Sequence, residues 1–171
     1  MTVFRWTAAF LCAVVAYLVG VALWPRFPAL FDPLLVVVVL FAFRHGPVSS
    51  QLVGLVAGLL LDGLSGSLWG LHGFAGTFVA FTVAVLAGRI VMGRQRVRVL
   101  LFALASALQQ GILVLLALLL VSRPELPQPG LVLVRIGLTA LVGALLLALG
   151  RRFEARWKRW KEKRMRRLRL R

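Results

Sequence analysis

Long apolar stretches separated by short polar turns run through the first 150 residues of the chain. A helix that crosses a membrane needs about 20 mostly apolar residues, because the hydrocarbon core is roughly 30 Å thick. Four stretches meet this length, at residues 6–24, 68–91, 99–121 and 131–149, and two shorter ones lie at 30–43 and 47–61. The pattern predicts an all-α polytopic membrane protein with six transmembrane helices over residues 1–150.

The two shorter stretches each begin with a helix-start signal and carry one acid. Asp32-Pro33 resembles an N-cap followed by proline at the first helical position, and Gly46-Pro47 opens the next stretch, which ends at Asp62. Both cross fully only if the two aspartates lie near an interface or in a protein-lined recess. The alternative is a re-entrant hairpin that enters from outside and buries the Arg44-His45 turn near mid-membrane.

Basic residues gather on one side of a six-span chain. Of 21 Lys and Arg, 18 fall on the side that both termini share, two (Arg26 and Arg123) fall on the opposite side, and Arg135 lies within the last stretch. Cytoplasmic loops of membrane proteins carry the excess of Lys and Arg, so both termini are expected in the cytoplasm. Twelve of these bases follow Gly150, and they account for most of the net charge of +16.

Residues 151–171 form a basic juxtamembrane tail with aromatic residues on one helical side. This pattern predicts an amphipathic helix on the inner leaflet, attracted to anionic lipid. Nucleic-acid binding is disfavoured, because the bases adjoin a membrane span and alternate with tryptophans typical of the membrane interface. The residues expected at the lipid surface are Arg151, Arg152, Trp157, Lys158, Trp160 and Lys161.

A run of glycines and polar residues, Gly-Leu-Leu-Leu-Asp-Gly-Leu-Ser-Gly-Ser-Leu-Trp-Gly-Leu-His, interrupts the apolar pattern at 58–72. A charge at membrane depth costs roughly 2.5 kcal/mol to well above 10 kcal/mol, so Asp62 requires a partner. Asp62 and His72 are both expected towards the outer face, where they can form a hydrogen bond. The alternative is that Asp62 caps the following turn while His72 reaches the interface.

Small residues recur every four positions on the two helices that flank this motif. Such stripes let helix backbones approach closely and drive association in lipid, so the two helices are expected to pack as an antiparallel pair. The same stripes leave a homodimer open. The members are Ser50, Gly54 and Gly58 on the first helix, and Gly76, Ala80, Ala84 and Gly88 on the second.

Three further polar residues lie within the last two stretches. Gln109 and Gln110 lie in the middle of residues 99–121, where amides usually form hydrogen bonds to a neighbouring helix. Arg135 lies near the outer end of 131–149 and is expected to reach the interface, with Glu125 or Asp62 as the alternative partners.

Catalytic groups are scarce in this sequence. Ser65 and His72 crowd one turn with Asp62, and no glycine-flanked nucleophile elbow is present. Two histidines and the single Cys12 are too few for a catalytic metal site or an intrachain disulfide. The sequence predicts a non-enzymatic protein with no catalytic residue, metal ligand or cofactor.

Three segments together resemble the MreD family of bacterial rod shape-determining membrane proteins. They are Asp32-Pro33, the turn from Arg44 to Pro47, and the glycine-rich run at 58–72. The resemblance covers roughly residues 29–90. It centres on a pattern formed by Asp62, Ser65, Gly66 and Gly70, with His72 close behind. Gly63 and Trp69 depart from the usual family pattern at this turn.

The resemblance implies a non-catalytic scaffold of the cell-elongation complex in the bacterial inner membrane. Such a protein would bind the single-pass protein MreC directly, and MreB and the peptidoglycan synthase complex indirectly, to help control peptidoglycan synthesis and cell shape. The family is also similar in architecture to the substrate-binding subunits of energy-coupling-factor vitamin transporters. This second likeness leaves open a solute-binding function, in which Asp62, His72 and Arg135 would line an outward polar cavity.

Overall fold

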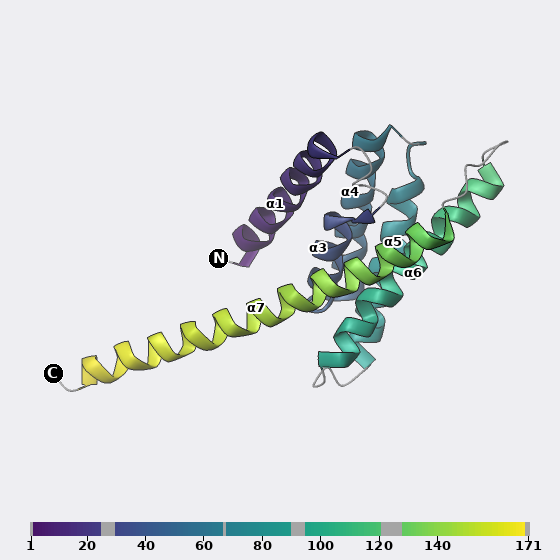
Figure 1. The fold of residues 1–171 in the computed structure, drawn as a ribbon. Coiled ribbons are helices and arrows are strands. Elements are labelled where there is room, and N and C mark those ends of the chain that lie inside the picture. Colours follow the sequence, from purple (N-terminus) through teal and green to yellow (C-terminus); the bar gives the residue numbers. More distant parts are fainter. Residues whose placement is uncertain (1, 25–29, 67, 90–94, 121–127, 170–171) are drawn as a thin grey trace.

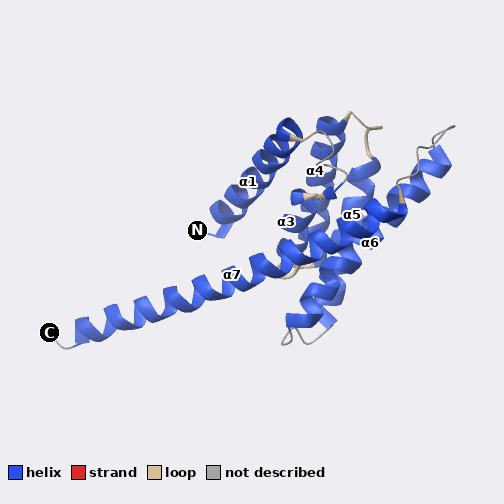
Figure 2. Cartoon of the chain, viewed as in Figure 1, coloured by secondary structure: helices blue, strands red, loops and turns tan. Residues whose placement is uncertain are grey.

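The computed structural model describes residues 2–24, 30–66, 68–89, 95–120 and 128–169, and its regular structure over these ranges is helical (Figures 1 and 2). Five of the helices are long and apolar enough to cross a membrane, which makes the chain an integral multi-pass membrane protein. The helices are α1 (Thr2–Leu23), α3 (Pro33–Ala42), α4 (Pro47–Ser65), α5 (Leu71–Arg89), α6 (Gln95–Leu120) and α7 (Pro129–Arg169).

Helix α3 corrects the prediction of six full spans. It has 10 residues, so at 1.5 Å per residue it is about 15 Å long, half of the hydrocarbon thickness. Its Asp32 N-cap accepts a hydrogen bond from the backbone N–H of Leu35 at 3.1 Å, and Pro33 occupies the first turn. The helix ends at Ala42, and the Gly46-Pro47 turn then starts α4.

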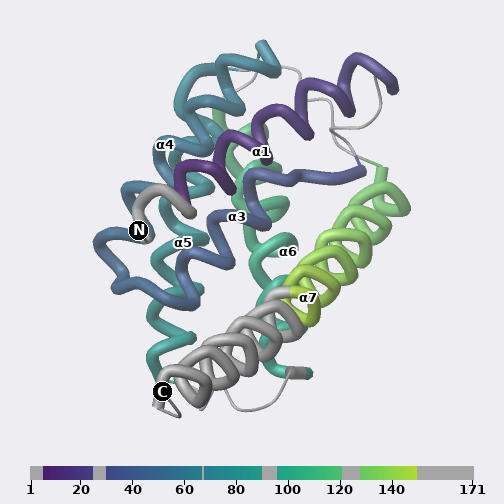
Figure 3. Tube along the Cα trace, turned by 90° about the vertical axis from the view of Figure 1, so that its left-hand side faces the viewer, coloured from purple at the N-terminus to yellow at the C-terminus, as the bar shows by residue number. Residues whose placement is uncertain are grey.

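The short helix α3 lies at the centre of the bundle, against α1, α4, α5, α6 and α7 (Figure 3). Its run of valines is buried, and both hydrophobic core clusters contain α3 residues. β-Branched residues are only moderate helix formers, so packing on all sides rather than intrinsic propensity holds this segment helical. Phe43, just beyond its last turn, packs edge-on against Phe102 of α6 at 5.5 Å between ring centroids.

Helices α4 and α5 form the most extensive pair in the fold, and their small residues face each other. A Cβ built on Gly76 would lie 2.5 Å from the carbonyl oxygen of Gly54, and one built on Gly58 would overlap the carbonyl group of His72. Ser50, Ala80 and Ala84 are buried beside them. Gly88 differs from these residues, because a Cβ built on it would have no atom within 4 Å.

Helices α6 and α7 pack against each other along a regular register. Phe102 lies against Gly143, where any side chain would overlap the phenylalanine ring, and Arg135 lies beside Gln110. Counting one helical turn along each antiparallel helix places Ser106 opposite Thr139, between these two contacts. Both hydroxyl-bearing side chains are fully buried.

Helix α7 is continuous from Pro129 to Arg169, so the basic tail is helical and joins the last span without a break (Figure 1). The side chains of Arg151, Arg152, Trp157, Lys158, Trp160 and Lys161 lie outside the described part of the structure. Their location on the inner leaflet therefore stays a prediction.

Candidate functional site

The glycine-rich turn between α4 and α5 is organised around the carboxylate of Asp62, which is completely buried. Oδ2 accepts hydrogen bonds from the backbone N–H of Gly70 at 2.9 Å and of Gly73 at 3.2 Å. Oδ1 accepts from the backbone N–H of His72 at 3.0 Å and lies 2.7 Å from His72 Nδ1. Asp62 thus satisfies the free N–H groups at the start of α5 from the end of the preceding helix.

Local sequence explains why the chain can bring this carboxylate to the next helix. Helix α4 ends at Ser65, and the C-cap Gly66 has a left-handed φ of 65°, which terminates helices at little cost for glycine. Gly70 has a φ of 98°, so the backbone turns sharply just before α5 begins. The three backbone N–H groups and the His72 ring therefore meet at one carboxylate.

The two sequence alternatives for this motif are combined in the structure. Asp62 both caps the turn and bonds the His72 ring, whose side chain is 17% exposed. Ser65 lies one turn from Asp62, but its hydroxyl donates to the carbonyl oxygen of Leu61 at 2.7 Å. That hydroxyl is therefore held against its own helix.

A second carboxylate cluster surrounds Asp32, which is 2% exposed. Besides capping α3, its Oδ2 accepts from Gln109 Nε2 of α6 at 3.1 Å and pairs with Arg135 Nη2 of α7 at 3.4 Å. Gln110, with its amide oxygen turned towards Arg135, accepts from Nε at 3.1 Å and from Nη1 at 3.0 Å. The Asp32 cluster therefore ties three helices together in the middle of the bundle.

Arg135 has a partner that was not among those expected from the sequence. It neither reaches the interface alone nor pairs with Asp62, and Glu125 lies outside the described residues. Its partner is Asp32, 103 residues earlier in the chain. The signal that could have indicated this pair is their opposite charge. Asp32 and Arg135 both lie within apolar stretches, and pairing offsets the cost of burying each charge.

Three buried oxygens near the α6–α7 interface make no hydrogen bond to any part of the chain that the structure describes. They belong to Ser106, Gln109 and Thr139. Of these three residues only Gln109 stands out in the sequence, because an isolated Ser or Thr in an apolar run is common in membrane helices and carries little signal.

Neither cluster offers an obvious place for a cofactor or solute. A cavity of about 10 Å³ lies between the Asp32 cluster and His72, far below the roughly 300 Å³ at which small-molecule sites begin. Within the described ranges, no three His, Cys, Asp or Glu residues come together in a way that could hold a metal ion.

This fold, with two carboxylate clusters that fasten helices to one another, is that of a polytopic helical membrane protein with a rigidly tied core. The family model of the rod shape-determining protein MreD matches residues 1–126, which is most of the chain. The chain belongs to the MreD family, a family of shape-determining membrane proteins rather than enzymes. No match was found among curated proteins or among solved structures.

Membership in the family confirms the resemblance drawn from the segments around Asp32, Arg44 and Asp62. The matched range ends before α7 begins, so the helix that carries Arg135 and the basic tail lies beyond it.

Proposed function

We propose that this protein is a non-catalytic scaffold of the cell-elongation complex that binds MreC in the bacterial inner membrane. Through MreC it helps control peptidoglycan synthesis and cell shape, with both termini in the cytoplasm and with MreB and the synthase complex as indirect partners. The observation that supports this proposal is that the buried charged groups bond neighbouring helices to one another. The charged groups of both clusters are engaged in joining helices, which suits a rigid support better than a reaction site.

The surface available to a partner is not the small-residue stripes, which the sequence left open to a homodimer. The small-residue stripes around Gly54 and Gly76 pack against each other within the chain. Neither MreC nor a second copy could bind them unless α4 and α5 separated. Helix α5 instead exposes Phe74, Phe78 and Phe81, which are 57%, 48% and 41% accessible and recur at helical spacing on one side. Phenylalanine is among the residue types enriched at protein–protein interfaces.

Co-expression of tagged MreC with this chain, followed by solubilisation in mild detergent, tests the proposal directly. MreC is expected to co-purify, and a photo-crosslinking residue at Phe78 should capture it. The same residue at Leu145 of α7, which is 59% exposed, serves as the control and should capture much less. Failure of MreC to co-purify at all would refute the scaffold function, whereas equal crosslinking at both positions would refute only the α5 surface.

The alternative function is a solute-binding subunit of an energy-coupling-factor type vitamin transporter. It requires an outward polar cavity, and the space beside His72 and Asp32 measures only about 10 Å³. A thermal-shift screen of vitamins on the purified chain separates the two functions. Strong stabilisation by one vitamin would favour the transporter subunit over the scaffold.

A further inference from the structure

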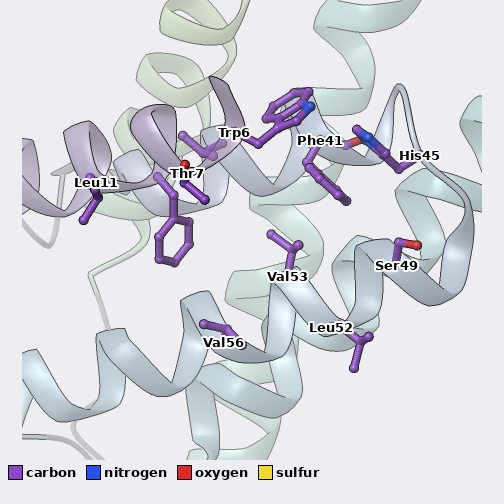
Figure 4. A pocket seen from close by; sticks show the side chains of 11 residues that line it. Trp6, Thr7, Leu11, Phe41, His45, Ser49, Leu52, Val53 and Val56 are labelled. Carbon is purple, nitrogen blue, oxygen red and sulfur yellow. The ribbon is translucent and has the colours of Figure 1, made fainter. Parts of the chain in front are cut away.

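Two hollows adjoin the short helix α3, and they differ in what lines them. The larger is a groove of about 730 Å³ between α1, α3 and α4, and its lining is mostly hydrocarbon (Figure 4). The smaller, called here the small cavity, measures about 10 Å³ and lies between α3, α4, α5 and α6. Three polar side chains line the small cavity, those of Asp32, His72 and Gln109. Such groups can hold a ligand by hydrogen bonds.

The amide of Gln109 brings an unpaired acceptor to the small cavity. Its Nε2 donates to Asp32 Oδ2 at 3.1 Å, and this bond fixes which end of the amide faces the carboxylate. Its Oε1 is buried and makes no hydrogen bond to any part of the chain that the structure describes. Gln109 is only 3% exposed, and a buried acceptor without a hydrogen bond is costly, so Oε1 requires a donor.

Asp32 can provide a second acceptor beside this oxygen. A carboxylate offers about four lone-pair sites, and three hydrogen bonds reach this one. Oδ1 accepts from the backbone N–H of Leu35, and Oδ2 accepts from Gln109 and Arg135. A small ligand with two hydrogen-bond donors can therefore bond Gln109 Oε1 and Asp32 together.

Water matches both the size and the charge of the small cavity. One water molecule needs about 10–15 Å³, so a cavity of about 10 Å³ admits one water and no larger solute. A metal cation is disfavoured, because the Arg135 guanidinium, 3.4 Å from Asp32 Oδ2, already compensates the charge of this carboxylate.

The other side of the small cavity belongs to the helices of the glycine-rich turn. His72, whose ring bonds the Asp62 carboxylate, lines it from α5, and Gly54 and Gly58 line it from α4. These are the glycines at which α4 and α5 approach each other closely. A ligand in the small cavity therefore lies between the two carboxylate clusters.

We propose that the small cavity binds one water molecule, which donates hydrogen bonds to Gln109 Oε1 and to the Asp32 carboxylate and contacts His72. The water connects the cluster that ties α3, α6 and α7 together with the turn that joins α4 and α5. This hydration site does not depend on MreC binding or on the scaffold function.

Nuclear Overhauser contacts between water and methyl groups of the full chain, methyl-labelled and purified in deuterated detergent, test the proposal. Leu35 and Val38 line the small cavity, whereas Val36 and Val39 lie on the same helix, are similarly buried and do not line it. Water is expected to give cross-peaks to the methyl groups of the first pair and none to those of the second. Absence of the cross-peaks at Leu35 and Val38, or equal cross-peaks at all four residues, would overturn the proposal.

Gln109→Met provides a second test, because it removes the unpaired oxygen and leaves an apolar side chain. The water cross-peak at Val38 should be lost in this variant. Gln110→Met is the matched control, because Gln110 bonds Arg135 and does not line the small cavity, and it should keep the cross-peak. An unchanged cross-peak in Gln109→Met would overturn the proposal, and if this variant fails to fold, the four methyl positions of the unchanged protein still decide. Methyl shifts at Leu35 and Val38 that move when sodium chloride replaces choline chloride would overturn it in favour of a bound cation.

Discussion

Replacing Asp62 by alanine tests the principal structural conclusion, that one carboxylate holds the α4–α5 turn. The change removes the acceptor of three backbone N–H groups and of the His72 ring. The loss of a helix N-cap costs about 1 kcal/mol, and a hydrogen bond to a charged group contributes about 1.5–3 kcal/mol. Because these bonds share one carboxylate, we expect the free energy of unfolding to fall by about 3–5 kcal/mol.

Thermal unfolding of the detergent-solubilised protein measures this loss. For a chain of this size, 1 kcal/mol corresponds to a shift of about 2–4 °C, so Asp62→Ala should lower Tm by roughly 6–20 °C. Asp62→Asn keeps one acceptor oxygen but presents an amide donor to the N–H groups that the other oxygen served. It should fall between the alanine variant and the unchanged protein.

Thr82→Ala is the control, because the Thr82 hydroxyl is exposed and bonds only the carbonyl oxygen of Phe78 in its own helix. Surface changes of this kind usually stay within about 0.5 kcal/mol. If Asp62→Ala and Thr82→Ala unfold at the same temperature, the buried carboxylate does not stabilise the turn.

Two further predictions concern the contacts between helices, and both are read from Tm in the same detergent. Gly58→Ala should lower the free energy of unfolding by about 1–3 kcal/mol, because the new methyl group would overlap the carbonyl of His72. Gly111→Ala is the control and should leave it unchanged, because the space around Gly111 is open. Equal effects of the two changes would contradict the close approach of α4 and α5. Arg135→Gln should cost about 3–5 kcal/mol by leaving the Asp32 carboxylate buried without its cation, and adding Asp32→Asn should restore part of this loss. Strictly additive single effects would show that the two side chains do not interact.

Much of the fold could be predicted from apolar run lengths and turn residues alone. The long stretches at 6–24, 99–121 and 131–149 lie within α1, α6 and α7 apart from residues at their ends. The prediction works because lipid offers no hydrogen bonds to the backbone. A long apolar stretch that spans the membrane must therefore satisfy its own N–H and C=O groups, which a helix does. The glycine spacing also predicted that α4 and α5 pack as an antiparallel pair, and the two helices approach each other closely at these glycines.

The depth and length of α3 could not be predicted in this way. Residues 30–43 contain enough apolar side chains to suggest a marginal span, yet only Pro33–Ala42 are helical. A buried half-length helix is stable only when its neighbours satisfy the polar groups at its ends, and those neighbours belong to other parts of the sequence. Asp32 depends on Gln109, 77 residues away, and on Arg135, 103 residues away.

The sequence by itself determined that this is a multi-pass helical membrane protein of the MreD family, because hydropathy, glycine spacing and the Asp62 motif act locally. Tertiary structure alone decided which polar groups meet. It gave Arg135 the partner Asp32 and made Asp62 the cap of the following helix. The physical reason is that the cost of a buried charge forces it to find a partner, but only the packing of all the helices determines which partner lies within reach.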